Sequence, residues 1–433
     1  MQNDIEYLNE KQKELFIKKS TRIADSYLKR IESMKDTPIA VRPFLQVLKD
    51  TYINLKEKSF SNPTIGTYCI MVPEELIYAV GAVPIRLCSG NYIAYSIGDD
   101  YIPRDACPLI KAVVGAYYTK TFPIYENNLM TIIPSSCDCK KKMAGIVKDF
   151  KSTYIMNMPP NRIGDSNIEQ YMKEFYNLIY VLEQATGNTI TPESLQQAIN
   201  TVGYAQYELS RFMKFRRHNP SLMYGTQVMA VMNSYAYMKA DEWGLLMSSL
   251  NRELEDRLKN KQFVGKNKQP RILLTGSPVT FPNMKVPLLI EEMGGMLVAD
   301  ETCIGERAMY DPVVVVNPDF DGMVRALANR YIRPCTCPVF ADNAQRIYKI
   351  KQMIKDHEVQ GIIYYVLRGC LVYDYEYKLL EDELADLNIP IIRLESDYNE
   401  EDVEQLRIRI EAFIEMIKLK EYNENKKKGG KNE

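Results

Sequence analysis

Cysteine is the residue type in this chain that is most able to carry chemistry. The 433 residues contain nine cysteines but only two histidines. Histidine is the usual general base of hydrolases and a common metal ligand, so its scarcity leaves sulfur as the expected reactive group. An odd number of cysteines in a long chain does not favour a disulfide framework. Metal ligation, redox chemistry and simple burial of thiols remain as interpretations.

Six of the cysteines form two sets of three that recur along the chain. The stretches YIPRDACP (101–108) and YIRPCTCP (331–338) are identical at four of eight positions and align Cys107 with Cys337. In each half, a predicted strand and a cysteine precede this stretch, and a predicted strand, a cysteine and a helix follow it. The candidate metal ligands are therefore Cys88, Cys107, Cys137, Cys303, Cys337 and Cys370.

Most of these cysteines stand where a predicted strand ends or a predicted helix begins. The carboxyl ends of parallel strands form the crevice in which open α/β sheets bind ligands. Helix N-termini in that crevice carry partial positive charge, which favours thiolate over thiol. Cys107 fits such a position because Pro108 is a favourable first residue of a helix. The lysines at 140–142 after Cys137 fit the same role or a solvated helix face.

The spacing of the cysteines narrows the choice of metal. Structural zinc sites usually contain two close cysteine pairs, which this chain lacks. Its only tight spacings are CxC, at Cys137/Cys139 and Cys335/Cys337. Ferredoxin-type CxxCxxC runs are also absent. From spacing alone, both an iron–sulfur cluster held by tertiary structure and a set of buried structural thiols remain open.

The elements that would position these cysteines alternate between strand and helix in two separate parts of the chain. Predicted strands include VPIRLC and TIIPSS in the first part, and RILLTG, MLVAD and GIIYYVL in the second. This alternation is typical of parallel sheets with crossover helices. We predict an α/β fold with two Rossmann-like parallel-sheet halves. The expected segments are a helical N-terminal segment (1–61), a first α/β cluster-binding domain (62–162), a helical insertion (163–267), a second α/β cluster-binding domain with a C-terminal helix (268–420) and a disordered tail (421–433).

Other function classes are disfavoured by composition and by missing motifs. The chain has 55 basic and 56 acidic residues, so no net field attracts nucleic acid or an anionic membrane. The GxSxG, HExxH and P-loop signatures do not occur. No signal peptide and no apolar run of membrane-spanning length is recognisable, so we expect a cytoplasmic protein. Several charged helical residues are expected at the surface, namely His218, His357, Glu74, Glu75, Glu291 and Glu292.

At this point an ordered set of motifs resembles a known group of proteins. The stretches are GTYCIMVPEELIYAVGAVPIRLC, IPRDACPLIKAVVGA, IIPSSCDCKKKMA, RILLTGSP, VADETCIGER, RPCTCP, GIIYYVLRGC and ESDYNEEDVEQLRIRIEAFIEMI. Over residues 60–420 they resemble the 2-hydroxyacyl-CoA dehydratase and benzoyl-CoA reductase superfamily. The ordered set is far more specific than any single stretch.

The resemblance implies a set of cluster ligands. Dehydratase-type members of the superfamily hold one 4Fe–4S cluster with three cysteines per subunit. On the match, these three would be Cys107, Cys137 and Cys370. Cys139 lies where the family has a small residue, and it is left unassigned.

Within the superfamily the sequence is most similar to the double-cubane cluster proteins. Members of that branch hold two bridged four-iron cubanes, an 8Fe–9S cluster, with six thiolates in one chain. The match then adds Cys88, Cys303 and Cys337 to the first three. Cys69 and Cys335 also match family positions, so either could replace Cys88 or Cys337 as a ligand.

The resemblance also implies a mechanism and partners. A separate ATP-hydrolysing iron–sulfur activator protein would inject an electron at low potential, and the cluster would pass it to a small-molecule substrate in the crevice. The missing P-loop agrees with this division of labour. Oxygen sensitivity, an anaerobic cytoplasm and a homodimer are expected, with no nucleic-acid or membrane partner.

Two other hypotheses stay open. The first is a 2-hydroxyacyl-CoA dehydratase subunit with one 4Fe–4S cluster, which the surplus of cysteines does not require. The second is a non-enzymatic scaffold with reduced structural thiols. The iron content per chain separates the three hypotheses.

Overall fold

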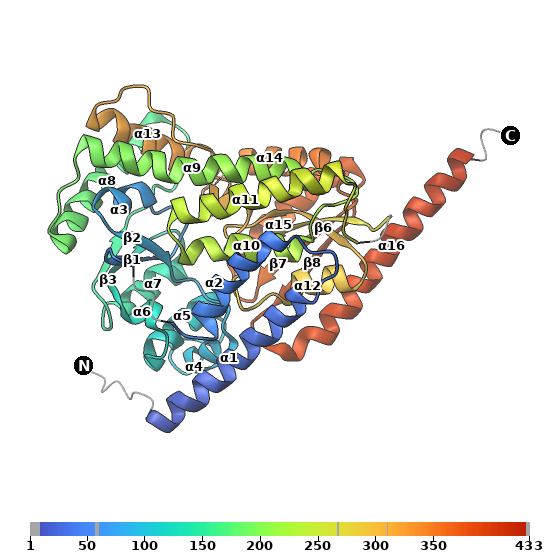
Figure 1. The fold of residues 1–433 in the computed structure, drawn as a ribbon, viewed down its shortest axis with the longest axis horizontal. Helices are drawn as coiled ribbons and strands as arrows, with labels where there is room; N and C mark the ends of the chain where they lie inside the picture. Colours follow the sequence, from blue (N-terminus) through green and yellow to red (C-terminus); the bar gives the residue numbers. More distant parts are fainter. Residues whose placement is uncertain (1–8, 57–59, 266–267, 310, 430–433) are drawn as a thin grey trace.

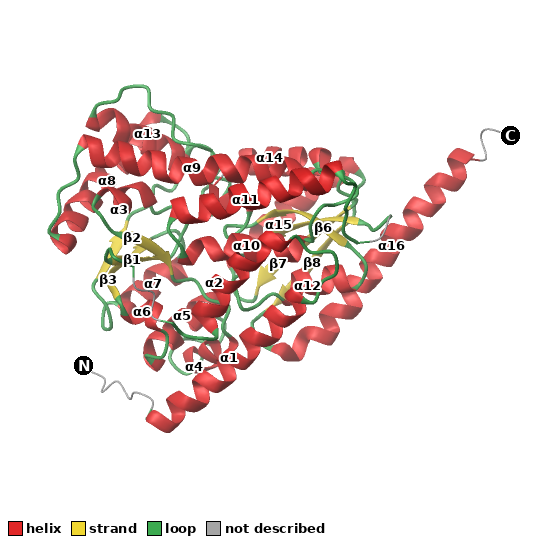
Figure 2. Ribbon diagram, in the orientation of Figure 1, coloured by secondary structure: helices red, strands yellow, loops and turns green. Residues whose placement is uncertain are grey.

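Two parallel sheets of four strands each form the frame of the molecule (Figures 1 and 2). The structure is a computed structural model that describes residues 9–56, 60–265, 268–309 and 311–429. The first sheet has the order β2-β1-β3-β4 and the second the order β6-β5-β7-β8. The predicted α/β class with two Rossmann-like halves is therefore confirmed. The strands are β1 (Thr64–Thr67), β2 (Val83–Arg86), β3 (Asn128–Pro134), β4 (Thr153–Met156), β5 (Arg271–Gly276), β6 (Met296–Glu301), β7 (Gly361–Leu367) and β8 (Ile391–Ser396).

The two sheets have the same topology, so β1, β2 and β3 correspond to β5, β6 and β7. In the first sheet Thr67 of β1 aligns with Arg86 of β2, and in the second Thr275 of β5 aligns with Glu301 of β6. The strands of each sheet therefore end at one common edge. Strands β5, β6 and β7 are buried along their whole length, as expected for parallel strands covered on both faces.

Strand β1 was not predicted, although it occupies an inner position of the first sheet. Its sequence Thr-Ile-Gly-Thr is short and contains glycine, so it lacks the continuous apolar run of β5 or β7. Its register with β2 and β3 places it, and these partners come later in the chain. The turn after β1 carries Cys69, which therefore belongs to the same sheet edge as Cys88.

Helices of the first half connect and cover its strands. Cys107 and Cys137 are the N-cap residues of two of them, α5 and α7. Pro108 begins α5, as the sequence predicted. The helices are α3 (Glu74–Ala79), α4 (Tyr92–Gly98), α5 (Pro108–Thr119), α6 (Pro123–Glu126) and α7 (Asp138–Val147).

The N-terminal segment and the stretch between the two sheets are helical. In Figure 1 the long helices α9 and α11 run side by side from the first half toward the second. Every residue of α10 is buried, so this helix forms part of the core between the halves. The elements are α1 (Glu10–Glu32), η1 (Ile39–Val41), α2 (Arg42–Tyr52), α8 (Asp165–Thr186), α9 (Pro192–Arg216), α10 (Gly225–Ser234), η2 (Tyr235–Tyr237) and α11 (Ala240–Lys259).

Helices of the second half follow the same pattern, and the last of them projects from the body in Figure 1. The predicted disordered tail (421–433) is wrong for residues 421–429, because α16 continues through Gly429. Lysine and glutamate favour helix, and no proline or glycine interrupts the sequence before that point. Residues 430–433 lie outside the described residues. The elements are α12 (Lys285–Glu292), η3 (Glu306–Met309), α13 (Phe320–Ile332), α14 (Ala344–Asp356), α15 (Leu371–Leu384), η4 (Ala385–Leu387), η5 (Glu400–Asp402) and α16 (Val403–Gly429).

Two residues predicted at the surface are buried instead. The Glu75 side chain is fully enclosed and accepts a hydrogen bond from the Tyr331 hydroxyl at 2.6 Å. His357 follows α14 and is only 3% exposed. Its backbone carbonyl accepts a hydrogen bond from Arg271. Both residues meet partners that are distant in sequence, which local charge patterning does not reveal.

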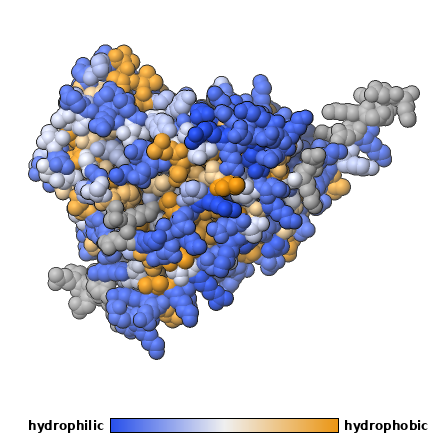
Figure 3. Space-filling model, viewed as in Figure 1, coloured by the Kyte–Doolittle hydropathy of each residue, from blue (hydrophilic) through white to orange (hydrophobic). Residues whose placement is uncertain are grey.

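The surface is mixed in character. The face in Figure 3 is mostly hydrophilic, with small apolar groups between the charged side chains. None of the helices in the described ranges combines the length and apolar character needed to cross a bilayer.

Candidate functional site

A cavity of about 190 Å³ lies at the carboxyl ends of the strands, where the two halves meet. Both halves contribute cysteines to its wall. All six cysteines proposed as ligands line it, together with two of the remaining three. The lining cysteines are Cys69, Cys88, Cys107, Cys137, Cys139, Cys303, Cys337 and Cys370.

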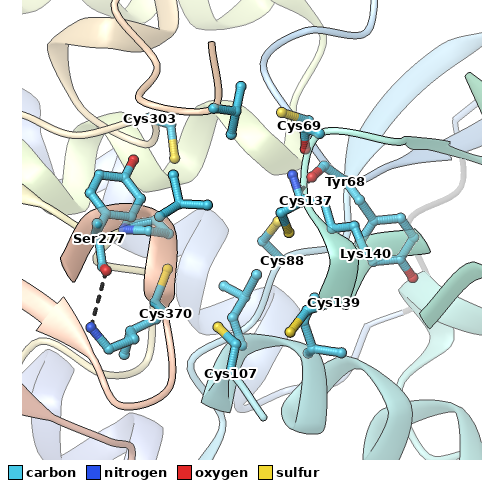
Figure 4. A pocket seen from close by; sticks show the side chains of 18 of the residues that line it. Tyr68, Cys69, Cys88, Cys107, Cys137, Cys139, Lys140, Ser277, Cys303 and Cys370 are labelled. Carbon is cyan, nitrogen blue, oxygen red and sulfur yellow. Dashed lines mark hydrogen bonds between the residues drawn. The ribbon is translucent and has the colours of Figure 1, made fainter. Parts of the chain in front are cut away.

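The two halves place their cysteines on facing sides of the cavity (Figure 4). Cys69 and Cys88 follow the ends of β1 and β2, and Cys137 follows β3. On the opposite side, Cys303 follows β6 and Cys370 follows β7. The equivalent strands of the two sheets thus deliver equivalent cysteines to one space.

Three of the cysteines are N-cap residues of helices. Cys107, Cys137 and Cys370 precede α5, α7 and α15, respectively. Each sulfur accepts a hydrogen bond from a backbone N–H in the first turn of its own helix, which acts to lower the pKa of the thiol. These N–H groups also carry the positive end of the helix dipole. The three sulfurs are therefore placed to carry negative charge.

A close approach between two loops brings Cys107 and Cys370 together. The thiol of Cys107 hydrogen-bonds to Cys370 and, with the Ser277 hydroxyl, keeps the pKa of Cys370 below its usual value. Gly369 makes this approach possible. It has a φ of 72°, and a Cβ atom there would lie 2.1 Å from the backbone oxygen of Asp105. No other residue type fits that position without moving the loops apart.

Cys335 is the one cysteine that does not line the cavity. It is buried on the far side of its loop, with its sulfur 3.3 Å from the Met71 sulfur. Its carbonyl accepts a hydrogen bond from Arg162. Of the two alternative ligands inferred from the resemblance, the cavity therefore offers Cys69 and not Cys335.

Three cationic side chains surround the thiols, and two of them are neutralised by carboxylates. Arg86 pairs with Glu74 at 2.8 Å, and Arg307 pairs with Glu301 at 2.6 Å. The third cation is Lys140, in the first turn of α7. Among the described residues no carboxylate lies within 4.0 Å of its ammonium group. The hydrogen-bond partner of Lys140 is the thiol of Cys69.

The charge of Lys140 acts on the neighbouring thiols. Burial raises the pKa of Cys69, but the ammonium and its hydrogen bond outweigh burial, so the pKa of this thiol is lowered. Burial raises the pKa of Cys88 and of Cys303, with Lys140 opposing the change in both. Sulfur ligands lose their protons when a metal binds, and a nearby cation makes that loss easier.

A buried network of charges fixes the loops of the second half. Glu301, at the end of β6, bonds to Arg307 and Arg346, and all three side chains are fully buried. The same carboxylate accepts hydrogen bonds from Thr275 at 2.7 Å and from Thr336 at 3.1 Å. Since Thr336 precedes Cys337 and Glu301 precedes Cys303, this network holds both cysteine loops.

Sequence reasoning missed two of the functional side chains. Lys140 was not separated from the two lysines that follow it, although its position just after an N-cap cysteine was a usable signal. Ser277 was noted only as part of a strand-to-helix turn. Its oxygen accepts the backbone N–H of Leu367 at 3.0 Å, and its hydroxyl reaches Cys370, so it braces one wall of the cavity (Figure 4).

The donor set fits an iron–sulfur group. In the part of the chain that the structure describes, no three His, Cys, Asp or Glu side chains converge at the spacing of a single metal ion. The thiols instead surround a space. Thiolates are the usual ligands of iron–sulfur clusters, and the unpaired ammonium of Lys140 lacks an anion that such a group would supply. The cysteines most able to hold it are those at the strand ends and helix N-termini.

Comparison with known proteins identifies the family. Residues 69–417 match the model of the family described as 2-hydroxyglutaryl-CoA dehydratase, D-component. The dehydratase subunit YjiM of Escherichia coli (strain K12) is 30% identical over 85% of this chain and 94% of its own length. The beta subunit of (R)-phenyllactyl-CoA dehydratase from Clostridium sporogenes is 24% identical over 84% of this chain and 95% of its own. One of the subunits of benzoyl-CoA reductase from Thauera aromatica is 22% identical over 84% and 93%. The chain therefore belongs to the 2-hydroxyglutaryl-CoA dehydratase D-component family.

Proposed function

We propose that this chain is the catalytic iron–sulfur component of a two-component reductase that acts on small molecules. Its cofactor would be a double-cubane 8Fe–9S cluster, and its electron donor a separate ATP-hydrolysing iron–sulfur protein. The observation that carries the proposal is the ring of eight cysteines around one cavity. A single 4Fe–4S cluster with three cysteine ligands leaves most of these thiols unused.

The residues of the chain have distinct roles in this proposal. Cys88, Cys107 and Cys137 would hold the group from the first half. Their counterparts from the second half are Cys303, Cys337 and Cys370. When bound, such a cluster supplies one-electron chemistry at low potential. The protein contributes ligand geometry, hydrogen bonds to sulfur and exclusion of water.

The shape and polarity of the cavity favour a small substrate. Apart from the cysteines, several apolar side chains face the space, among them Ile110, Ile304 and Leu371. Leu371 is 68% exposed, so this part of the wall lies at the surface and offers an entrance. A small apolar or weakly polar molecule could enter there without losing strong hydrogen bonds to water.

The test is an iron and sulfide count after anaerobic reconstitution of the full chain. We expect about eight irons per chain, as the 8Fe–9S composition requires. Serine substitution of Cys303 or Cys88 is expected to lower the count, because both side chains would be ligands. An iron-free wild-type chain, with an unchanged absorption spectrum, would refute the proposal.

The alternative function is that of a 2-hydroxyacyl-CoA dehydratase subunit with one 4Fe–4S cluster. Two of the relatives described above are named as dehydratase subunits, which favours this alternative. It requires about four irons per chain, held by three cysteines. Under it, C88S and C303S would keep the wild-type iron content, whereas C107S and C370S would lose it. The same count therefore separates the two functions.

A further inference from the structure

We propose that Lys140 is a positioning residue that raises the reduction potential of the group bound in the cysteine-lined cavity. The inference rests on the proposed function and deepens it. It starts from the placement of a single uncompensated cation among thiols of both halves. Figure 4 shows Lys140 beside Cys69, Cys88 and Cys137 and facing the side that carries Cys303.

The geometry of α7 explains why this lysine and not its neighbours reaches the cavity. Lys140 is the third residue of the helix, directly after the N-cap Cys137, and it lines the cavity. Lys141 and Lys142 follow on the exposed face, and Lys141 pairs with Asp138 at 3.2 Å. Successive residues of a helix point in different directions, so three consecutive lysines have separate environments.

The lack of a carboxylate partner gives Lys140 its role. Arg86 and Arg307 also face the thiols, but Glu74 and Glu301 neutralise them. The field of Lys140 is not cancelled in this way. A positive charge in a partly buried site stabilises nearby negative charge more strongly than it would in water. One electron added to a sulfur-ligated group makes that group more negative by one charge, with no bond formed or broken. Lys140 therefore favours the reduced form.

The experiment compares four variants of the reconstituted full chain by anaerobic redox titration, with dithionite as the reductant and electron paramagnetic resonance as the readout. K140M and K140Q remove the charge, K140R keeps it, and K142M removes an exposed lysine from the same helix as the matched control. We expect K140M and K140Q to lower the equilibrium constant of one-electron reduction at least tenfold, which is about 59 mV. K140R and K142M should stay within threefold of wild type.

Iron content, measured on every sample, separates the possible failures. Wild-type iron content together with an unchanged potential in K140M or K140Q would overturn the inference and leave the proposed function intact. Loss of iron from both neutral variants, with full iron in K140R, would also overturn it, because Lys140 would then act in retention of the group. A wild-type chain without iron would overturn the proposed function itself.

Discussion

His357 is expected to make the protein lose stability as the pH falls below neutral. It lies in a buried site that faces the arginines at 216, 217 and 271. Burial, together with the charges of Arg216, Arg217 and Arg271, lowers the pKa of this imidazole from 6.5 to about 3. In the folded protein His357 therefore stays neutral at pH values where the unfolded chain binds a proton. The perturbation that removes this effect is H357Q, which cannot titrate but keeps an N–H donor.

The size of the effect follows from proton linkage. Between pH 6.5 and pH 3 the unfolded state holds one more proton at this site than the folded state. The free energy of unfolding therefore falls by about 1.4 kcal/mol for each unit that the pH drops. At about pH 5 the accumulated loss is about 2 kcal/mol, and at pH 7.5 it is close to zero. H357Q does not suffer this loss.

The assay is urea denaturation of the wild-type chain and of H357Q, at pH 7.5 and at pH 5. Burial raises the pKa of Glu291 and of Glu306 to about 7, which adds stability as the pH falls. Both carboxyls titrate in both proteins and cancel in the difference. We expect the stability of H357Q relative to wild type to rise by about 2 kcal/mol between the two pH values. H218Q, which removes the other histidine from a half-buried helix end, is the matched control.

Parallel pH dependences of wild type and H357Q would refute this reasoning. That result would mean that the imidazole is protonated in the folded protein despite its burial among arginines. A shift of the same size in H218Q would also contradict it, since the effect would then not be specific to the buried site.

Three further predictions concern the walls of the cavity. G369A forces a side chain into a left-handed backbone position and against the loop that carries Cys107; we expect a loss of about 1–3 kcal/mol in urea denaturation and a lower iron content. In contrast, G145A lies in open space on α7 and should not destabilise the protein. E301Q leaves two buried arginines without their shared carboxylate, and urea denaturation should show a loss of about 3–5 kcal/mol. C337S should lower the iron count, whereas C335S should not, because only the first of these cysteines faces the cavity; equal iron loss in both would contradict the geometry.

The ring of cysteines could be predicted from the sequence because it depends on few structural details. Parallel strands of one sheet end at a common edge, so any cysteine just beyond a strand end lies near that edge. Cys88, Cys303 and Cys370 needed only a correct assignment of the preceding strands. The repeat of the same order in the two halves then pointed to one shared site.

Other parts of the site depend on contacts that local sequence does not record. Cys69 was a weaker candidate because β1 is too short and polar to be recognised before its neighbours are known. Glu75 was predicted to be exposed, but its partner Tyr331 lies 256 residues further along the chain. The distinction between Cys335 and Cys337 likewise depends on how one loop packs against Met71.

The division of the cysteines between two distant parts of the chain has a consequence for how the protein is made. Ribosomal synthesis delivers Cys88, Cys107 and Cys137 well before Cys303 and Cys370, and the helices from α8 to α11 are translated in between. The first half has no complete wall until β7 has joined the second sheet. A group that needs ligands from both halves must therefore be inserted after translation of nearly the whole chain. Until then, the early thiols depend on the cell to keep them reduced and free of other metals.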